Sequence, residues 1–270
     1  MALIDTHCHL DVPPLGEDPA GVLERAAARG VTQIILPAYD RASWPGIVAM
    51  ATTYAQVHPA LGLHPWVAFE EKPGNKLPET SVGIKDQLSA AIDAAPMKIV
   101  AIGEIGLDTK VSLTDGYAEL PTQLPVLAAQ LDLAADLDLP VILHCRGAFE
   151  ELLAAVALHG GRLRGVVHAY SRGIELAERI IAAGLHLGLG GAVTRERARV
   201  RKAVPGLPLD RIVLETDAPS IGLDGVPAHE TEPHHVRDVV EAIAGLRGDT
   251  LEHVAEVTTA NARALFDLPA

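Results

Sequence analysis

The sequence predicts an α/β fold in the form of a single (β/α)8 barrel, the TIM-barrel architecture, spanning residues 1–270. Short apolar runs typical of buried parallel strands alternate with helical patterns along the whole chain. Eight such strand-and-helix units can be distinguished, and 270 residues is a normal length for one barrel. Because no linker or low-complexity stretch interrupts the alternation, we expect one domain.

Each predicted strand is a run of aliphatic and β-branched residues that ends at a turn residue or a polar side chain. The opening strand comprises Leu3 and Ile4, and strand four leads into the segment Gly103-Glu-Ile-Gly-Leu-Asp108. Strands are expected at residues 3–4, 31–36, 57–63, 98–102, 140–143, 165–167, 185–189 and 211–214.

The segments between the strands have helical patterns with recognisable ends. Pro19 near its start and Gly30 after its end delimit the first helix, and Gly184 ends the sixth. A loop rich in Pro, Gly and Lys, at residues 70–79, precedes the third helix. Helices are expected at residues 19–29, 43–54, 81–95, 122–137, 148–158, 174–183, 194–204, 233–246 and 250–266.

The chain is acidic, with 22 basic and 35 acidic residues and a net charge of −13. Tight binding along a nucleic-acid duplex requires many neutralised phosphates, so this composition disfavours that class of partner, although it allows a strand end held by metal ions in a cleft. The sequence shows no signal-peptide pattern and no apolar run of transmembrane length. We therefore expect a cytoplasmic protein with no membrane association, and a monomer is the default for this architecture.

His7 and His9 are the first candidate metal ligands, because they follow the opening strand at a spacing of two residues. Side chains two apart on a strand point to the same side, so both imidazoles can bind one cation. Further polar residues follow other strands, namely His64, Glu104, His144, His168 and Asp217. Active sites of such barrels form at the carboxyl ends of the strands, and this convergence predicts a metal centre there.

Four histidines and two carboxylates exceed the needs of one tetrahedral site and suit two divalent ions that share a carboxylate. Mixed imidazole and carboxylate ligands fit Zn, Mn, Ni or Fe, and Mg less naturally, and the sequence does not choose among these ions. The expected ligands are His7, His9 and Asp217 for one ion, His144 and His168 for the other, and Glu104 between the two.

The whole set of motifs resembles the TatD family of metal-dependent hydrolases, within the wider amidohydrolase superfamily. The resemblance extends over essentially the whole chain. It depends on Ile4-Asp-Thr-His-Cys-His-Leu-Asp11, Gly62-Leu-His-Pro65, Gly103-Glu-Ile-Gly-Leu-Asp108, Pro140-Val-Ile-Leu-His-Cys-Arg146, His168-Ala-Tyr-Ser171, Leu214-Glu-Thr-Asp-Ala-Pro219, and Asn261 with Leu265-Phe266. It implies a (β/α)8 barrel, a two-metal site at the matching positions, and phosphodiester hydrolysis of the DNase or 3′-to-5′ exonuclease type.

The expected mechanism starts from a water shared by two cations, which loses proton affinity and becomes hydroxide near neutral pH. Asp217 is the expected base and proton shuttle, and Glu104 is the second expected catalytic residue. Arg146 can bind a phosphate or pair with a carboxylate at the rim. His64 can contact substrate or be a core histidine. Expected partners are DNA ends or single strands, or a small phosphoester.

Two loops depart from the family pattern, so the substrate class is less determined than the metal site. Residues 169–172 read Ala-Tyr-Ser-Arg where relatives often have Phe-Ser-Gly, and residues 227–233 replace a family Pro segment. One alternative is a hydrolase of a small ester, lactone, amide or phosphate ester on the same dinuclear site. A second alternative is a non-catalytic barrel that serves as an interaction protein.

Overall fold

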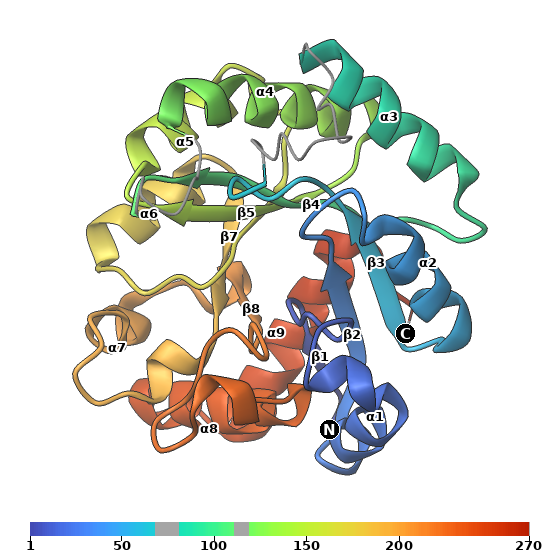
Figure 1. Ribbon diagram of the computed structural model, residues 1–270. Helices are drawn as coiled ribbons and strands as arrows, with labels where there is room; N and C mark the ends of the chain where they lie inside the picture. Colours follow the sequence, from blue (N-terminus) through green and yellow to red (C-terminus); the bar gives the residue numbers. More distant parts are fainter. Residues whose placement is uncertain (68–80, 111–118, 270) are drawn as a thin grey trace.

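The computed structural model describes residues 1–67, 81–110 and 119–269, and the loop expected at 70–79 lies outside these ranges. Eight parallel strands form one sheet in the order of the sequence, and the helices surround it (Figure 1), which confirms the predicted (β/α)8 barrel. The strands are β1 (Leu3–Asp5), β2 (Val31–Pro37), β3 (Val57–Leu61), β4 (Ala101–Asp108), β5 (Val141–Arg146), β6 (Gly165–Val167), β7 (Leu185–Leu189) and β8 (Ile212–Leu214).

Helices follow the strands, and capping residues in the sequence explain where α1 and α9 begin. Asp18 accepts a hydrogen bond from the Gly21 N–H before α1, with Pro19 in its first turn, and Thr250 caps α9 through the His253 N–H. The helices are α1 (Pro19–Ala28), α2 (Trp44–Thr53), α3 (Ser81–Ala94), α4 (Leu120–Leu137), α5 (Phe149–Ala157), α6 (Ile174–Ala182), α7 (Val200–Ala203), α8 (Val236–Arg247) and α9 (Leu251–Phe266).

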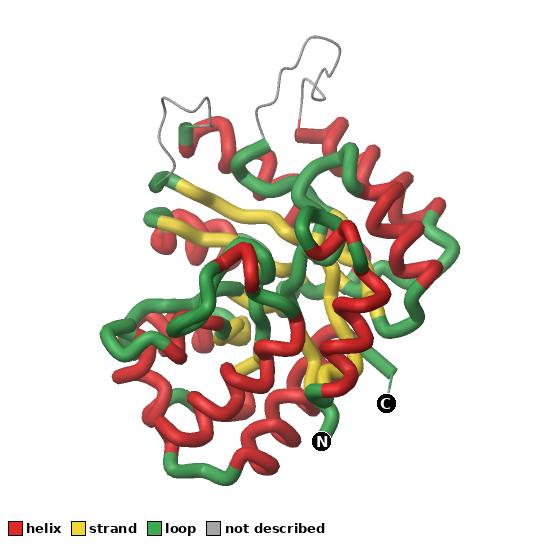
Figure 2. Tube along the Cα trace, turned by 60° about the horizontal axis from the view of Figure 1, so that its bottom comes forward, coloured by secondary structure: helices red, strands yellow, loops and turns green. Residues whose placement is uncertain are grey.

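The strands are buried on both faces, as a parallel barrel requires. Outside the sheet, the main core joins the strands to the surrounding helices (Figure 2). A second core lies among Ile4, Ile142 and Val213 of the strands, and α9 contributes Leu265 and Phe266 to it. Helix α9 therefore packs against the end of the barrel opposite the carboxyl ends of the strands, and leaves those ends free to form a site.

Backbone hydrogen bonds join the first strand to the last just beyond β1 and β8. The Asp217 N–H donates to the carbonyl of His7 at 2.8 Å, and the His9 N–H donates to the carbonyl of Ala218 at 2.8 Å. These bonds close the barrel and bring the first candidate ligands in the sequence next to the last one. As a result, the His7 and His9 side chains lie beside Asp217, more than 200 positions away in the sequence.

Strand β4 differs from the prediction, which placed it at residues 98–102. It begins at Ala101 and continues to Asp108, and its register with β5 shifts between Ile102 and Ile105. The strand therefore includes Gly103 and Gly106, although glycine is uncommon in strand interiors. Strand β5 also extends three residues beyond the predicted end, to Arg146, so the two strands pair along their full polar segments. Glu104 and His144 thus lie within strands.

The segment predicted to be helical at 194–204 is also different. A 3-10 turn covers Gly191–Thr194, and only Val200–Ala203 forms an α-helix. The Thr194 hydroxyl bonds to the Gly191 carbonyl and closes the turn, after which Arg195 is extended. The short helix passes into a 3-10 turn at Val204–Gly206, in which Pro205 has no N–H to continue the α-helical hydrogen bonds.

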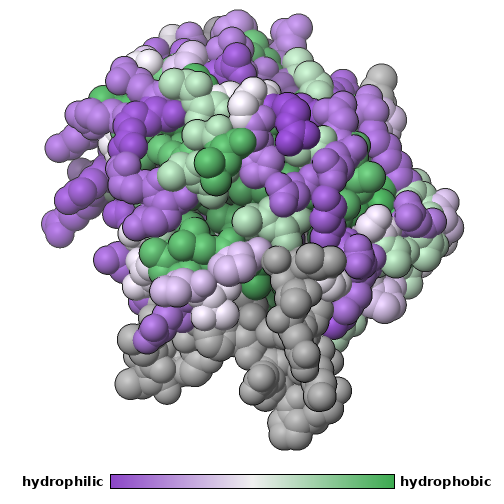
Figure 3. All heavy atoms as spheres, turned by 90° about the horizontal axis from the view of Figure 1, so that it is seen from above, coloured by the Kyte–Doolittle hydropathy of each residue, from purple (hydrophilic) through white to green (hydrophobic). Residues whose placement is uncertain are grey.

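The outer surface is mostly polar. In the face shown in Figure 3, hydrophilic side chains predominate and hydrophobic ones gather in a few hollows between them. Among the described residues, the large hydrophobic side chains that are exposed are Met1, Leu137 and Leu158. No helix in the described part of the chain has the length and apolar character needed to cross a membrane.

Gly106 allows the close approach of β4 and β5 that places Glu104, and we expect Gly106→Ala to destabilise the fold by roughly 3 kcal/mol. A Cβ at this position would lie 2.0 Å from the His144 carbonyl oxygen, and the residue has a φ of +149°. Gly245→Ala, on the open surface of α8, is the matched control and should stabilise by about 0.5–1 kcal/mol. Urea unfolding of both variants measures the difference. Equal stability of the two variants would contradict this account of β4.

Candidate metal centre

The residues predicted as metal ligands come together at the carboxyl ends of the strands. His7 and His9 follow β1, His168 follows β6 and Asp217 follows β8. Glu104 in β4 and His144 in β5 complete the group. All except His9 are buried, and His9 is partly exposed. Six residues from five separate parts of the chain therefore converge on one small volume.

The first cluster consists of His7, His9 and Asp217 around one oxygen of Glu104. The Nε2 atoms of His7 and His9 lie 3.3 Å apart, and the Nε2 of His9 is 3.4 Å from Oδ1 of Asp217. Oε2 of Glu104 lies 3.2 Å from Nε2 of His7 and 3.6 Å from Nε2 of His9. These four side chains can thus offer four ligand atoms to one point between them.

These spacings fit a bound divalent cation. Metal–nitrogen bonds of 2.0–2.1 Å in a tetrahedral site place neighbouring ligand atoms about 3.3–3.4 Å apart. The four distances given for the first cluster lie close to that value, and a fifth, from Nε2 of His7 to Oδ1 of Asp217, is 3.7 Å. Imidazole and carboxylate are also the ligand types that divalent transition metals prefer. The residues present therefore suit a metal ion.

The second cluster forms around the other oxygen of Glu104. Oε1 of Glu104 is 2.7 Å from Nε2 of His168 and 3.0 Å from Nδ1 of His144. These two ring nitrogens are 3.3 Å apart. Each carboxylate oxygen of Glu104 consequently faces its own set of imidazoles, which is the arrangement that a bridging carboxylate requires.

His64, predicted as a substrate-binding residue, is buried next to the second cluster. Its Nε2 lies 3.3 Å from Oε1 of Glu104, and it forms a possible three-residue cation site with Glu104 and His144. Its Nδ1 accepts a hydrogen bond from the Trp66 N–H. The structure thus places His64 among the side chains that surround Glu104, and a contact with substrate stays a prediction.

Asp108 is a candidate site residue to which the sequence reasoning assigned no role. Its Oδ2 lies 2.9 Å from Nε2 of His144 and 2.8 Å from the indole nitrogen of Trp66. A carboxylate on the far nitrogen of a ligating histidine fixes the ring orientation and makes the near nitrogen a better ligand. Asp108 follows Glu104 by four positions in one strand, a spacing that places both side chains on one face and is a signal of this role.

Glu215 lies next to His168 in a looser relation, without a hydrogen bond to its ring. Its Oε1 accepts a hydrogen bond from the Ala169 N–H and is 4.0 Å from Nδ1 of His168. Gly188 of β7 makes room for it, because a Cβ there would be 2.2 Å from Oε2 of Glu215. Among the described residues, neither that Oε2 nor Nδ1 of His168 has a hydrogen-bond partner. Glu215 is therefore a buried carboxylate beside His168 whose charge helps to raise the pKa of that ring.

The charges of the cluster are set by burial and by mutual contact. Burial would raise the pKa of Glu104, but His168, His64 and His7 hold the pKa well below its usual range. Burial would lower the pKa of His168, but Glu104 outweighs it and raises the pKa to about 10. Burial lowers the pKa of both His7 and His64 to about 4. The cluster thus combines a carboxylate, two neutral imidazoles ready to bind a cation, and one imidazolium that a cation would replace.

We expect metal binding at pH 7.5 to release at least one proton, since His168 is protonated in the ion-free protein and a ligating imidazole must be neutral. If one proton is released, the metal affinity should rise about tenfold for each unit of pH. This dependence should extend from the usual pKa of histidine up to the raised pKa of His168, about 10. Calorimetric titration with Mn²⁺ or Zn²⁺ in buffers of different ionisation enthalpy measures the release. His168→Gln should reduce it, and the exposed control His229→Gln should not. Binding without proton release in the unmodified protein would contradict these charges.

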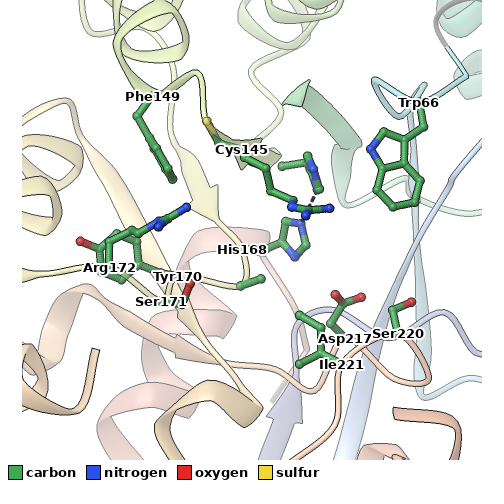
Figure 4. A pocket seen from close by; sticks show the side chains of 13 residues that line it. Trp66, Cys145, Phe149, His168, Tyr170, Ser171, Arg172, Asp217, Ser220 and Ile221 are labelled. Atoms are coloured by element: carbon green, nitrogen blue, oxygen red, sulfur yellow. Dashed lines mark hydrogen bonds between the residues drawn. The ribbon is translucent and has the colours of Figure 1, made fainter. Parts of the chain in front are cut away.

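A cleft of about 330 Å³ opens beside the second cluster (Figure 4). His144, His168 and Asp217 reach its wall, so the cluster is accessible from it. Arg146, predicted as a substrate-binding residue, also lines the cleft with its side chain half exposed, and its Nη1 lies 3.5 Å from Oδ2 of Asp108. Both interpretations left open for Arg146 are thus compatible: it pairs with a carboxylate and keeps donors toward the cleft.

A (β/α)8 barrel with histidines and carboxylates clustered at the carboxyl ends of its strands defines the class of metal-dependent hydrolases. The chain belongs to the TatD family, because the family model described as TatD related DNase matches residues 4–267. This confirms the resemblance that the sequence motifs indicated.

Relatives within the family match along their full lengths. The chain is 36% identical over 267 residues to the uncharacterized metal-dependent hydrolase YjjV of Escherichia coli, covering 98% of both chains. It is 33% identical to the 3′-5′ ssDNA/RNA exonuclease TatD of Erwinia billingiae, covering 99% of this chain and 100% of the relative. The crystal structure of the Escherichia coli YjjV protein superimposes with a TM-score of 0.88 at 34% identity, over 99% of this chain and 98% of that one.

Proposed function

We propose that this hydrolase is a phosphodiesterase that degrades DNA from strand ends or in single strands, with the character of a 3′-to-5′ exonuclease. The observation that carries the proposal is the pair of ligand clusters on the two oxygens of Glu104, next to a cleft that Arg146 lines. Such a pair of sites suits phosphoryl transfer, in which charge develops on several oxygens at once. The exonuclease name of the Erwinia billingiae relative adds support.

The proposal assigns the cluster residues to two divalent ions, which are Mn, Zn or Mg. His7, His9 and Asp217 would hold one ion, His144 and His168 the other, and Glu104 both. When bound, such ions lower the pKa of water and neutralise charge on phosphoryl oxygens. Asp108 and Glu215 would hold the rings of His144 and His168 in the ligating orientation.

The protein's own groups then have distinct roles. Asp217 reaches both the first cluster and the cleft, so its carboxylate can take a proton from the attacking water and return it to the leaving oxygen. Its neighbours, His9 above all, hold its pKa below the usual range despite burial, so it is ionised at neutral pH. Arg146 presents guanidinium donors to the cleft and can bind a phosphate oxygen through two of them.

The test is hydrolysis of single-stranded DNA labelled at the 3′ or the 5′ end, with Mg²⁺, Mn²⁺, Zn²⁺ or no metal. The expected result is stepwise shortening from the 3′ end that requires a metal. Covalently closed single-stranded circles are the matched control and should resist degradation. Cleavage of circles and linear strands at equal rates would contradict a preference for ends, and no cleavage by metal-loaded protein would contradict the phosphodiesterase proposal.

A second candidate function is hydrolysis of a small phosphate ester, and the size of the cleft favours it. About 330 Å³ is at the lower limit for ligand sites, so the cleft holds a single nucleotide-sized group and no long stretch of strand. Comparing an oligonucleotide with bis(4-nitrophenyl) phosphate and 4-nitrophenyl phosphate separates the two candidates. Faster turnover of both small esters than of the oligonucleotide would favour the second.

A further inference from the structure

The cleft is positively charged in a protein that is otherwise acidic. The charged side chains that line it, apart from histidines, are Arg146, Arg172 and Asp217. The protein as a whole has a net charge of −13. Since Asp217 is assigned to the metal-binding cluster, the two arginines set the charge available to a ligand in the cleft. An anionic group is therefore the ligand that the cleft attracts.

The two arginines differ in whether their guanidinium groups already have an acidic partner. Arg146 already lies 3.5 Å from a carboxylate oxygen of Asp108. Arg172 has no ion pair with any acidic side chain in the described ranges, and its Cζ lies 5.9 Å from the centre of the Phe149 ring. Stacking on an aromatic ring holds a guanidinium in place but leaves its donors unused. Arg172 thus presents an oriented cation whose hydrogen-bonding capacity is available to a ligand.

Arg172 is also separated from the groups that would act on the scissile bond. In Figure 4, Arg172 and Phe149 lie on one side of the cleft, and Asp217 and Trp66 lie on the other. Tyr170 and Ile221 also line the cleft, and the ring of Trp66 forms part of its wall on the Asp217 side. A ligand whose phosphate meets Asp217 would fill this partly apolar space with a sugar and a base, and its far end would reach Arg172.

We propose that Arg172 is a specificity-determining residue that binds a second phosphate of the substrate. The preferred substrate is then a phosphodiester whose terminal nucleotide carries an additional phosphate group, as in a phosphorylated strand end. The guanidinium fork matches the geometry of phosphate oxygens and gives charge-assisted hydrogen bonds. This inference rests on the proposed phosphodiesterase function and names the kind of end that the enzyme prefers.

Thymidine dinucleotides test the proposal, because each contains a single scissile phosphodiester. The metal-loaded enzyme is compared on TpT, on pTpT with a 5′ phosphate and on TpTp with a 3′ phosphate. At least one phosphorylated form should exceed TpT in kcat/KM by about 10- to 100-fold. Arg172→Gln should bring that ratio near one, Arg172→Lys should keep part of it, and Arg162→Gln, an exposed arginine before β6, should keep all of it.

Two results overturn the inference while leaving the proposed function intact: equal kcat/KM for the three dinucleotides, or a phosphate preference that survives Arg172→Gln. If no dinucleotide is cleaved, the proposed function fails, and binding decides the inference instead. Thymidine 3′,5′-bisphosphate and thymidine 5′-monophosphate are then titrated into the Mn²⁺-loaded protein. Tighter binding of the bisphosphate that Arg172→Gln abolishes supports the role of Arg172, and equal binding of both nucleotides rejects it.

Discussion

Asp217→Asn should lower the rate of DNA hydrolysis by about 10³-fold or more, with the fold retained. The amide keeps the shape of the side chain, but it cannot accept a proton and is a weaker metal ligand. Oδ1 of Asp217 lies 3.4 Å from Nε2 of His9 and 3.7 Å from Nε2 of His7, so the substitution affects the first cluster directly. The rate is measured with saturating Mn²⁺, and circular dichroism confirms that the variant is folded.

The matched control for this variant is Asp224→Asn, an exposed aspartate in the same loop after β8. It should hydrolyse DNA at the rate of the unmodified protein. The metal content of Asp217→Asn should fall toward one ion per chain, because the ligands of the second cluster remain. A variant that keeps full metal content and a rate within tenfold of the unmodified protein would show that Asp217 is neither the base nor an important ligand.

The barrel was predictable because its local signals agree with one another. The predicted limits of β6 and β7 match the structure residue for residue. Both are short and mainly aliphatic, and β7 lies between Gly184 and Gly190. The first helix ends within one residue of the prediction for a similar reason, since Pro19 and Gly30 delimit it. In these segments the secondary-structure propensities, the hydrophobic pattern and the turn residues all indicate the same structure.

Strand β4 was harder to predict because tertiary pairing overrides its local sequence. Glycines at positions 103 and 106 disfavour a strand by propensity, yet β5 pairs with the segment through Gly106 and Asp108. The close approach that makes glycine necessary at 106 comes from the His144 carbonyl, which is distant in sequence. No local pattern contains that information.

The candidate metal centre also has a part that the sequence predicts and a part that it does not. The convergence of the candidate ligands was predictable because strand ends converge in a barrel whatever the details of packing. The surrounding groups were less predictable. Glu215 fits beside His168 because Gly188 has no side chain there, and Arg172 lies over the ring of Phe149 at the cleft. Such contacts depend on loop and side-chain geometry that spacing alone does not give.

Glu104→Gln should have the broadest effect of any single substitution in the centre. The Glu104 carboxylate lies within 3.6 Å of Nε2 of His9 and within 3.3 Å of a ring nitrogen of His64, and it also contacts the rings of His7, His144 and His168. Glutamine has the same shape but no charge, so both clusters lose the anion they share. We expect metal content to fall at both sites and hydrolysis to drop below about 10⁻³ of the original rate.

The ion-free variant provides a second measurement that does not depend on activity. Glu104 raises the pKa of His168 to about 10, so the contact stabilises the folded state at pH values below the usual histidine pKa, and that contribution is lost as the pH rises through 10. In Glu104→Gln the pKa of His168 should fall by several units, which NMR titration of the ring measures. Stability relative to the unmodified protein should decrease most at acidic to neutral pH and least near pH 10. The exposed Glu230→Gln should change none of these quantities, and a His168 pKa that stays near 10 in Glu104→Gln would place the source of the shift elsewhere.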